Sequence, residues 1–231
     1  IRSNDYEIIV VDNGSLDNTK KIISMRFPSV KIIQNEMNRG VAPARNQGIQ
    51  AAKGVYTLIL DIDTCVHNNG IDRMLNYMDK NPDVGLCGPK LCFDDGTIQH
   101  SFRRFPVIQT KILRRINTTW AKRLLKNEYY NTETADIVNC GNEALEVDYV
   151  IGACQMIRRS ALDEVGLLDD KIFYGPEDVD FCLRMWLKGW KVVYLPDATV
   201  THYEQRITKK KMFSYITVKH IQGLIHYFIK Y

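Results

Sequence analysis

The stretch "VYTLILDIDTC", residues 55–65, decides the fold, because an apolar run ends there in two carboxylates one residue apart. The run from Val55 to Leu60 is typical of a buried strand. Successive side chains of a strand point to opposite faces, so we expect Asp61 and Asp63 on the same side, at the carboxyl end of this strand. Two such charges repel each other unless a cation or several donors lie between them. The alternative is that these aspartates only turn the chain or cap the next helix.

Strands and helices alternate on both sides of this stretch. Upstream, the sequence predicts strands over 5–12 and 30–35 and a helix from about Val41 to Ala52 that stops at Gly54. Downstream, it predicts a helix over 70–81, strands over 84–93 and 147–157, a short helix capped by Ser160, a helix opened by Pro176 and a last strand over 191–196. This alternation indicates an α/β fold with a mainly parallel sheet flanked by helices. Ligands bind beyond the carboxyl ends of such strands, where Asp12 joins Asp61 and Asp63.

The length of 231 residues, with 45% hydrophobic and 25% charged residues, suits one domain with a sizeable core. We expect that domain over residues 1–205, with an irregular basic insertion over 97–146. Residues 206–231 are expected to form a basic linker and an amphipathic helix. That helix either packs on the domain or lies on a membrane surface.

The net charge of +4 is mild, but two segments are strongly basic: 111–126 and 206–211. Each is either a solvated face or a site for phosphate or an anionic membrane. No recognition module for nucleic acid accompanies them, so nucleic acid is not an expected partner. The six cysteines show no CxxC spacing, which favours a reduced, cytoplasmic setting, with peripheral contact at the inner face of the membrane as the other possibility.

Acidic residues gather again in "YGPEDVDFCLRMWLKG", where Glu177, Asp178 and Asp180 fall in one helical first turn. Acids stabilise a helix N-terminus, which is one explanation for them. The other is a division of labour in which one acid serves as a general base. His202, after the last predicted strand, is either an ordinary packed histidine or a metal ligand beside the aspartates. Carboxylates with few nitrogen ligands favour Mg²⁺ or Mn²⁺.

Four segments of the chain, in order, resemble family 2 glycosyltransferases of the GT-A (Rossmann-like) fold. These segments are "YEIIVVDNGSLDNT", "NRGVAPARNQGIQAAKG", "LILDIDT" and the run from "VIGACQMI" to "DATVTH". The segment "GPKLCFDDGTIQHSFRRFP" is similar to the rhamnosyltransferase-like branch. The resemblance covers roughly residues 5–106 and 147–230.

The resemblance implies roles for individual residues. Asp12, Asn13, Asn38, Gly40, Arg45 and Asp61 match positions that bind the nucleotide and diphosphate of a sugar donor. Asp61, Asp63 and His202 match the metal site for Mn²⁺ or Mg²⁺. Asp178 matches the catalytic base of inverting members, with Glu177 as its orienting or acceptor-binding neighbour. Gly152, Ala153 and Cys154 match a wall of the sugar pocket.

The predicted function is therefore a metal-dependent, inverting transfer of a sugar, rhamnose or another hexose, from a nucleotide diphosphate to a saccharide or lipid-linked acceptor. A sugar nucleotidyltransferase and a non-catalytic sugar-nucleotide-binding module are the alternatives. The resemblance also implies that the family's first strand should precede Tyr6 and lie between the strands at 6–11 and 55–60. We therefore expect a sheet without this first strand, and a natural protein that is longer at its N-terminus.

Overall fold

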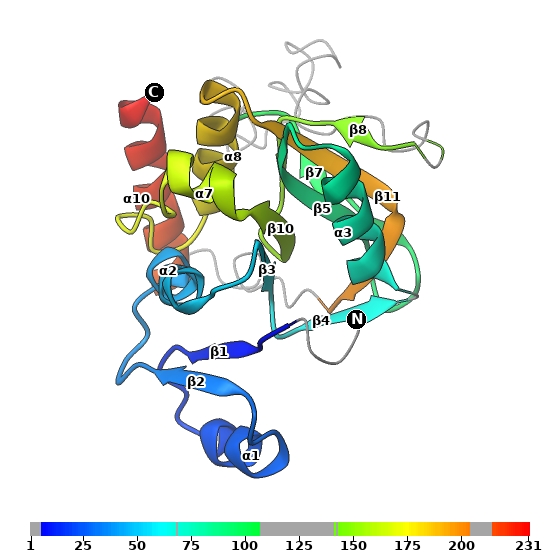
Figure 1. Cartoon of the computed structure of the whole chain (residues 1–231). Coiled ribbons are helices and arrows are strands. Elements are labelled where there is room, and N and C mark those ends of the chain that lie inside the picture. Colours follow the sequence, from blue (N-terminus) through cyan, green and yellow to red (C-terminus); the bar gives the residue numbers. More distant parts are fainter. Residues whose placement is uncertain (1–5, 68, 107–140, 142, 204–213) are drawn as a thin grey trace.

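The computed structural model of the chain describes residues 6–67, 69–106, 141, 143–203 and 214–231 (Figure 1). Its described helices are α1 (Thr19–Arg26), α2 (Val41–Ala51), α3 (Gly70–Lys80), α7 (Arg159–Val165), α8 (Glu177–Leu187) and α10 (Tyr215–Lys230). The expected insertion at 97–146 and the basic segments 111–126 and 206–211 lie wholly or mostly outside the described residues.

The main sheet runs in the order β3-β10-β5-β11-β4. These strands are β3 (Tyr56–Leu60), β4 (Thr64–His67), β5 (Val84–Cys92), β10 (Cys154–Arg158) and β11 (Lys191–His202). Because β10 is antiparallel to both β3 and β5, and β11 is parallel to β5, the strands β3, β5 and β11 share one direction. β4 is antiparallel to β11. The α/β fold class is confirmed, and the reversed strand β10 is the feature that the alternation of elements did not predict.

Four short strands lie at the margins. They are β6 (Ile98–Gln99), β7 (Phe102–Arg103), β8 (Leu145–Glu146) and β9 (Tyr149–Val150). β6 extends the main sheet at β5 and β8 extends it at β11, while β7 and β9 pair with each other. β6 and β7 precede residues 107–140 in the chain, and β8 and β9 follow them.

Alternate residues of the sheet enter two separate cores, as the two-residue period of a strand requires. On β5, Leu86 packs with residues of α7 and α8 in one core. Its neighbour Cys87 packs with Met74 and Met78 of α3 in the other. Helices therefore cover both faces, which explains why the strands read as nearly continuous apolar runs.

A second, two-stranded sheet stands apart from the main one (Figure 1). It pairs β1 (Ile9–Asp12) in parallel with β2 (Lys31–Gln34). Among the described residues β1 pairs only with β2, while β3 pairs with β10. A cleft of about 1860 Å³ is lined by β1 on one side and β3 on the other. This separation agrees with the expectation that the strands at 6–11 and 55–60 are not neighbours in the sheet.

Three local predictions were wrong. The predicted strand over 147–157 is interrupted at Ile151–Ala153, where the chain turns from β9 into β10. Ser160 is not a cap, because α7 begins one residue earlier and Arg158 occupies the capping position. The last strand does not end near 196 but continues as β11 to His202.

The C-terminal helix α10 lies beside α8 (Figure 1). Ser214 caps it, since its hydroxyl accepts a hydrogen bond from the Thr217 N–H at 3.2 Å. Gly223 and Tyr227 are its buried residues, whereas Ile229 is 81% exposed. No helix in the described part of the chain combines the length and the apolar character that crossing a bilayer requires.

Candidate active site

The aspartate pair lies in a turn, not on a strand. β3 ends at Leu60, and the turn 61–63 leads directly into β4. The Asp61 N–H donates to the Ala153 carbonyl at 2.9 Å, and the Thr64 hydroxyl donates to the Asp61 carbonyl at 2.6 Å. This turn, rather than strand alternation, brings both carboxylates to the same side, with Asp61 38% and Asp63 25% exposed at the side chain.

His202 joins the pair because β11 extends to it and β4 runs alongside. Ligand atoms of Asp61, Asp63 and His202 all lie within 4.8 Å of one another. The His202 Nδ1 lies 3.0 Å from the amide oxygen of Gln99. A carbonyl oxygen only accepts, so this contact puts the ring proton on Nδ1 and leaves the lone pair on Nε2. That lone pair faces the Asp63 carboxylate at 3.6 Å, an arrangement that suits a cation between them.

Arg45 on α2 connects the two acidic groups. Its guanidinium donates to the Asp61 carboxylate at 2.7 Å, to the Glu177 carboxylate at 3.1 Å and to the Gly152 carbonyl at 2.9 Å. Burial alone would lower the pKa of Arg45, but the charges of Asp61 and Glu177 outweigh it and raise that pKa. A side chain at residue 152 would displace the Arg45 guanidinium, since a Cβ there would lie 2.3 Å from the Arg45 Nη1. The absence of a side chain at Gly152 therefore leaves room for the Arg45 guanidinium.

The first turn of α8 presents its two acids differently. Asp178 is partly exposed, and its carboxylate oxygens accept hydrogen bonds from the N–H groups of Gly152 at 3.0 Å and of Val179 at 2.8 Å. Glu177 is 6% exposed, and its Oε2 has no hydrogen-bond partner. Burial, and next the charge of Asp178, raise the pKa of Glu177 to about 7, although Arg45 acts in the opposite direction. The backbone thus fixes Asp178 in place, whereas Glu177 is held against ionisation.

The residues matched to the donor nucleotide lie around the end of β1. The Asn13 side chain donates to the Asn38 side chain and to the Gly40 carbonyl, both at 3.0 Å. Gly40 itself has a φ of 98°, and a Cβ there would lie 2.7 Å from the Phe173 carbonyl oxygen. Asp12 is 5% exposed and accepts a hydrogen bond from the Ser15 N–H at 2.9 Å. These contacts shape a rigid loop beside the cleft.

Most of the site residues that the sequence predicted line one cleft. Those on its lining are Asn13, Arg45, Asp61, Asp63, Gly152, Ala153, Glu177, Asp178 and His202. Cys154 is instead buried at 2% exposure within β10. Gln99, which orients His202, is a site residue that sequence reasoning missed. A glycine inside a strand pattern is a known sign of close backbone approach, so Gly152 carried a signal of the arginine packed against it.

The comparison with known proteins agrees with this geometry. Residues 1–166 match the family described as "Glycosyl transferase family 2". The chain is 26% identical over 230 residues to the N-acetylglucosaminyl-diphospho-decaprenol L-rhamnosyltransferase of Mycobacterium tuberculosis, covering 92% of this chain and 71% of that protein. It is 25% identical over 210 residues to the dTDP-rhamnosyl transferase RfbF of Shigella flexneri, covering 88% of this chain and 61% of that protein.

Among solved structures, GalNAc-T7 with UDP, GalNAc and Mn²⁺ superposes with a TM-score of 0.62 at 21% identity. That match covers 85% of this chain but only 37% of the other. Fold and site together define a GT-A glycosyltransferase domain. The chain belongs to family 2 of the glycosyltransferases, and it is rhamnosyltransferase-like within that family.

The raised pKa of Glu177 makes stability depend on pH. The folded protein keeps a proton on Glu177 that the unfolded chain loses above its ordinary pKa of 4.5, so stability falls as pH rises from about 4.5 to about 7. Glu177→Gln cannot ionise, and we expect the wild type to lose up to about 3 kcal/mol relative to this variant across that window. Urea unfolding at pH 5 and pH 8 measures the difference. The exposed Glu36→Gln should keep the wild-type dependence, and parallel pH curves for Glu177→Gln and wild type would contradict the assignment.

Proposed function

We propose that the chain transfers a sugar from a nucleotide-diphosphate donor to a saccharide or lipid-linked acceptor, with inversion, in the synthesis of a cell-surface polysaccharide. The observation that carries the proposal is the arrangement of two acidic groups in one cleft. Asp61, Asp63 and His202 form one group, and Glu177 with Asp178 forms the other, with Arg45 between them. The first suits the diphosphate of a donor and the second suits the hydroxyl of an acceptor.

Asp178 is the proposed general base. Its two backbone hydrogen bonds fix the carboxylate and leave further lone pairs for a substrate proton. The carboxylate takes the proton of the acceptor hydroxyl as that oxygen forms a bond to the anomeric carbon. The bond from the anomeric carbon to the diphosphate breaks on the opposite face, and its electron pair leaves with the diphosphate. The product linkage is therefore inverted.

Asp61, Asp63 and His202 would hold the divalent metal, Mn²⁺ or Mg²⁺. The donor set suits such an ion: it consists of two carboxylates and the imidazole of His202, whose Nε2 lone pair is free to bind a cation. When bound, the metal offsets negative charge on the diphosphate leaving group. Arg45, with a pKa above its ordinary value, keeps its positive charge beside Asp61 and contributes to the same effect.

The loop around the end of β1 is the proposed nucleotide side of the cleft. Asp12, Asn13, Asn38 and Gly40 would bind the donor there, and the network centred on Asn13 keeps the loop in one conformation. The names of the relatives point to rhamnose as the transferred sugar. Family membership favours a transferase over a sugar nucleotidyltransferase, and a measurement of sugar transfer would separate a transferase from a non-catalytic binding module.

Residues 206–231 are the proposed contact with an anionic membrane, at the cytoplasmic face where a lipid-linked acceptor would be met. Four apolar side chains of α10 are about half exposed or more: Tyr215, Val218, Ile225 and Ile229. They recur three, seven and four residues apart, which places them along one stripe of the helix. The sequence after Glu204 contains six lysines or arginines and no acid, which suits anionic headgroups.

The metal site predicts metal-dependent nucleotide binding. Calorimetric titration with UDP, dTDP and GDP should show one of them binding in the presence of Mn²⁺ and more weakly without it. Asp63→Ala should abolish the metal-dependent part, while Asp163→Ala, an exposed acid on α7, should leave it unchanged. Binding of the same strength with Mn²⁺ or with a chelator would refute the metal role of this cluster.

The base assignment predicts a large loss of turnover in Asp178→Asn. An amide cannot take the proton, so we expect kcat to fall about 10²- to 10⁴-fold while nucleotide affinity stays near the wild-type value. Transfer of radiolabelled sugar measures kcat, and calorimetry measures the affinity. Near-normal turnover in this variant would remove Asp178 from the role of base.

The exposed stripe of α10 predicts membrane binding. The intact chain should sediment with liposomes that contain anionic lipid and not with neutral ones. Combining Ile225→Ser and Ile229→Ser should weaken sedimentation, whereas Val55→Ser, an equally exposed apolar residue far from α10 in the sequence, should not. If the intact chain fails to bind anionic liposomes at low salt, the membrane proposal is wrong.

A further inference from the structure

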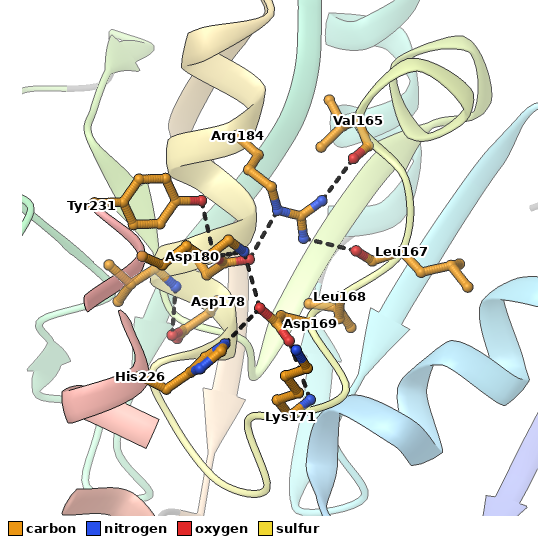
Figure 2. Close-up of polar contacts among 12 residues, drawn as sticks. Val165, Leu167, Leu168, Asp169, Lys171, Asp178, Asp180, Arg184, His226 and Tyr231 are labelled. Atoms are coloured by element: carbon orange, nitrogen blue, oxygen red, sulfur yellow. Dashed lines mark hydrogen bonds and ion pairs between the residues drawn. The ribbon is translucent and has the colours of Figure 1, made fainter. Parts of the chain in front are cut away.

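We propose that the C-terminal end of α10 holds the acidic first turn of α8 in its working position, with Lys230, Tyr231 and His226 as positioning residues. The inference rests on the proposed function, because it concerns the turn that carries Asp178. None of these three residues, of which Tyr231 directly follows α10, belongs to the cleft lining described above. They contact two carboxylates, those of Asp169 and Asp180. Figure 2 shows both carboxylates with His226 and Tyr231.

Asp180 is the first of these carboxylates. It follows Asp178 by two residues, so the two side chains leave the helix about 200° apart. Asp178 reaches the cleft, and Asp180 is fully buried on the opposite side. The Asp180 N–H also donates to the Pro176 carbonyl at 3.0 Å, which closes the first turn of α8. Whatever holds Asp180 therefore holds the backbone that presents Asp178.

Three side chains donate to the buried Asp180 carboxylate. The Lys230 ammonium lies 2.6 Å from one oxygen, and the Tyr231 hydroxyl lies 3.0 Å from the same oxygen. The Arg184 Nε donates to the other oxygen at 2.9 Å. Arg184 belongs to α8 itself and also binds the carbonyls of Val165 and Leu167, each at 2.7 Å (Figure 2). The donors from α10 are thus the link between the C-terminal helix and the acidic turn.

Asp169, in the loop between α7 and α8, is the second carboxylate. One of its oxygens accepts from Lys230 and from the His226 ring, both at 3.0 Å. Burial raises the pKa of Asp169, but the hydrogen bonds from His226 and Lys230 outweigh burial and bring it to about 2. The ammonium of Lys230 therefore bridges the side chains of Asp169 and Asp180. Removing it would leave Asp180 buried beside Asp169 with less compensation for either charge.

The same loop is tied to the helix that carries Arg45. The Asn46 side chain, on α2, accepts from the Leu168 N–H at 3.0 Å and donates to the Leu168 carbonyl at 2.8 Å. Lys230 thus braces a loop that is fixed at its other side to α2. The acidic turn is held between Arg45 on the cleft side and α10 on the buried side.

A second contact of α10 lies immediately before the turn. A Cβ at Gly223 would lie 2.7 Å from the Gly175 carbonyl oxygen and 3.3 Å from the Pro176 Cδ. The backbone of α10 therefore rests directly on the two residues that precede Glu177. Displacing a catalytic group by about 1 Å can cost about 10²-fold in rate, so losing this support should lower turnover.

The test replaces Lys230 by methionine, which keeps the length of the side chain and removes its charge. Lys188→Met, an exposed lysine just beyond the other end of α8, is the matched control. We expect Lys230→Met to lower kcat about 10- to 100-fold. Its Mn²⁺-dependent nucleotide affinity should stay unchanged, because the metal and nucleotide residues lie on other elements. Lys230→Arg, which restores the charge and can bridge both carboxylates, should recover most of the loss.

Hydrogen exchange of the backbone amides of Gly152, Val179 and Asp180 provides a readout that does not depend on activity. Lys230→Met should speed their exchange and Lys188→Met should not. Tyr231→Phe, which removes a single hydroxyl from Asp180, should give a smaller change in the same direction and serves if Lys230→Met does not fold. Unchanged exchange in both variants, or a kcat equal to that of Lys188→Met, would overturn the inference. If Lys230→Met alters the exchange but the wild type transfers no sugar, the result would instead count against the proposed function.

Discussion

The buried guanidinium of Arg45 is the interaction on which the site depends. A cation taken out of water needs acceptors in fixed positions, and this one has the carboxylates of Asp61 and Glu177 and the carbonyl of Gly152. These three acceptors belong to the turn after β3, the first turn of α8 and the loop before β10. Because a single planar group bonds to all three, their relative positions are coupled. Removing one of these acceptors would leave the buried charge of Arg45 less compensated by the other two.

The acids of α8 divide their tasks according to their environment. Asp178 is reachable and is fixed by backbone amides, so it can accept a proton without leaving its place. Glu177 is buried beside Arg45, and burial is the main cause of its raised pKa of about 7. Asp180 is fully buried and tied by side chains of α8 and α10. One helical turn thus carries a carboxylate that lines the cleft, a buried carboxyl that bonds to Arg45 and a buried carboxylate that bonds to Arg184, Lys230 and Tyr231.

Both sheets contribute residues to the lining of one cleft. The loop at the end of β1 stands on the small sheet, while the metal cluster and the acidic turn stand on the main sheet and its covering helices. The cleft between β1 and β3 lies where these parts face each other. The chain shares its overall fold with GalNAc-T7, at a TM-score of 0.62.

The sequence by itself determined the elements and the chemistry available to them. Runs with a period of two or 3.6 residues located β3, α2 and β5 to within one residue at each end, and the start of α8 to within one residue, because such patterns depend only on near neighbours in the chain. The order of motifs determined the family. Only the tertiary structure decided that β10 is reversed, that Gln99 orients His202, and that Ile229 points outward while Gly223 and Tyr227 pack inward. It also decided that Arg45 bonds to Glu177, 132 residues away. Contacts at that separation depend on which surfaces meet after folding, and no local periodicity records them.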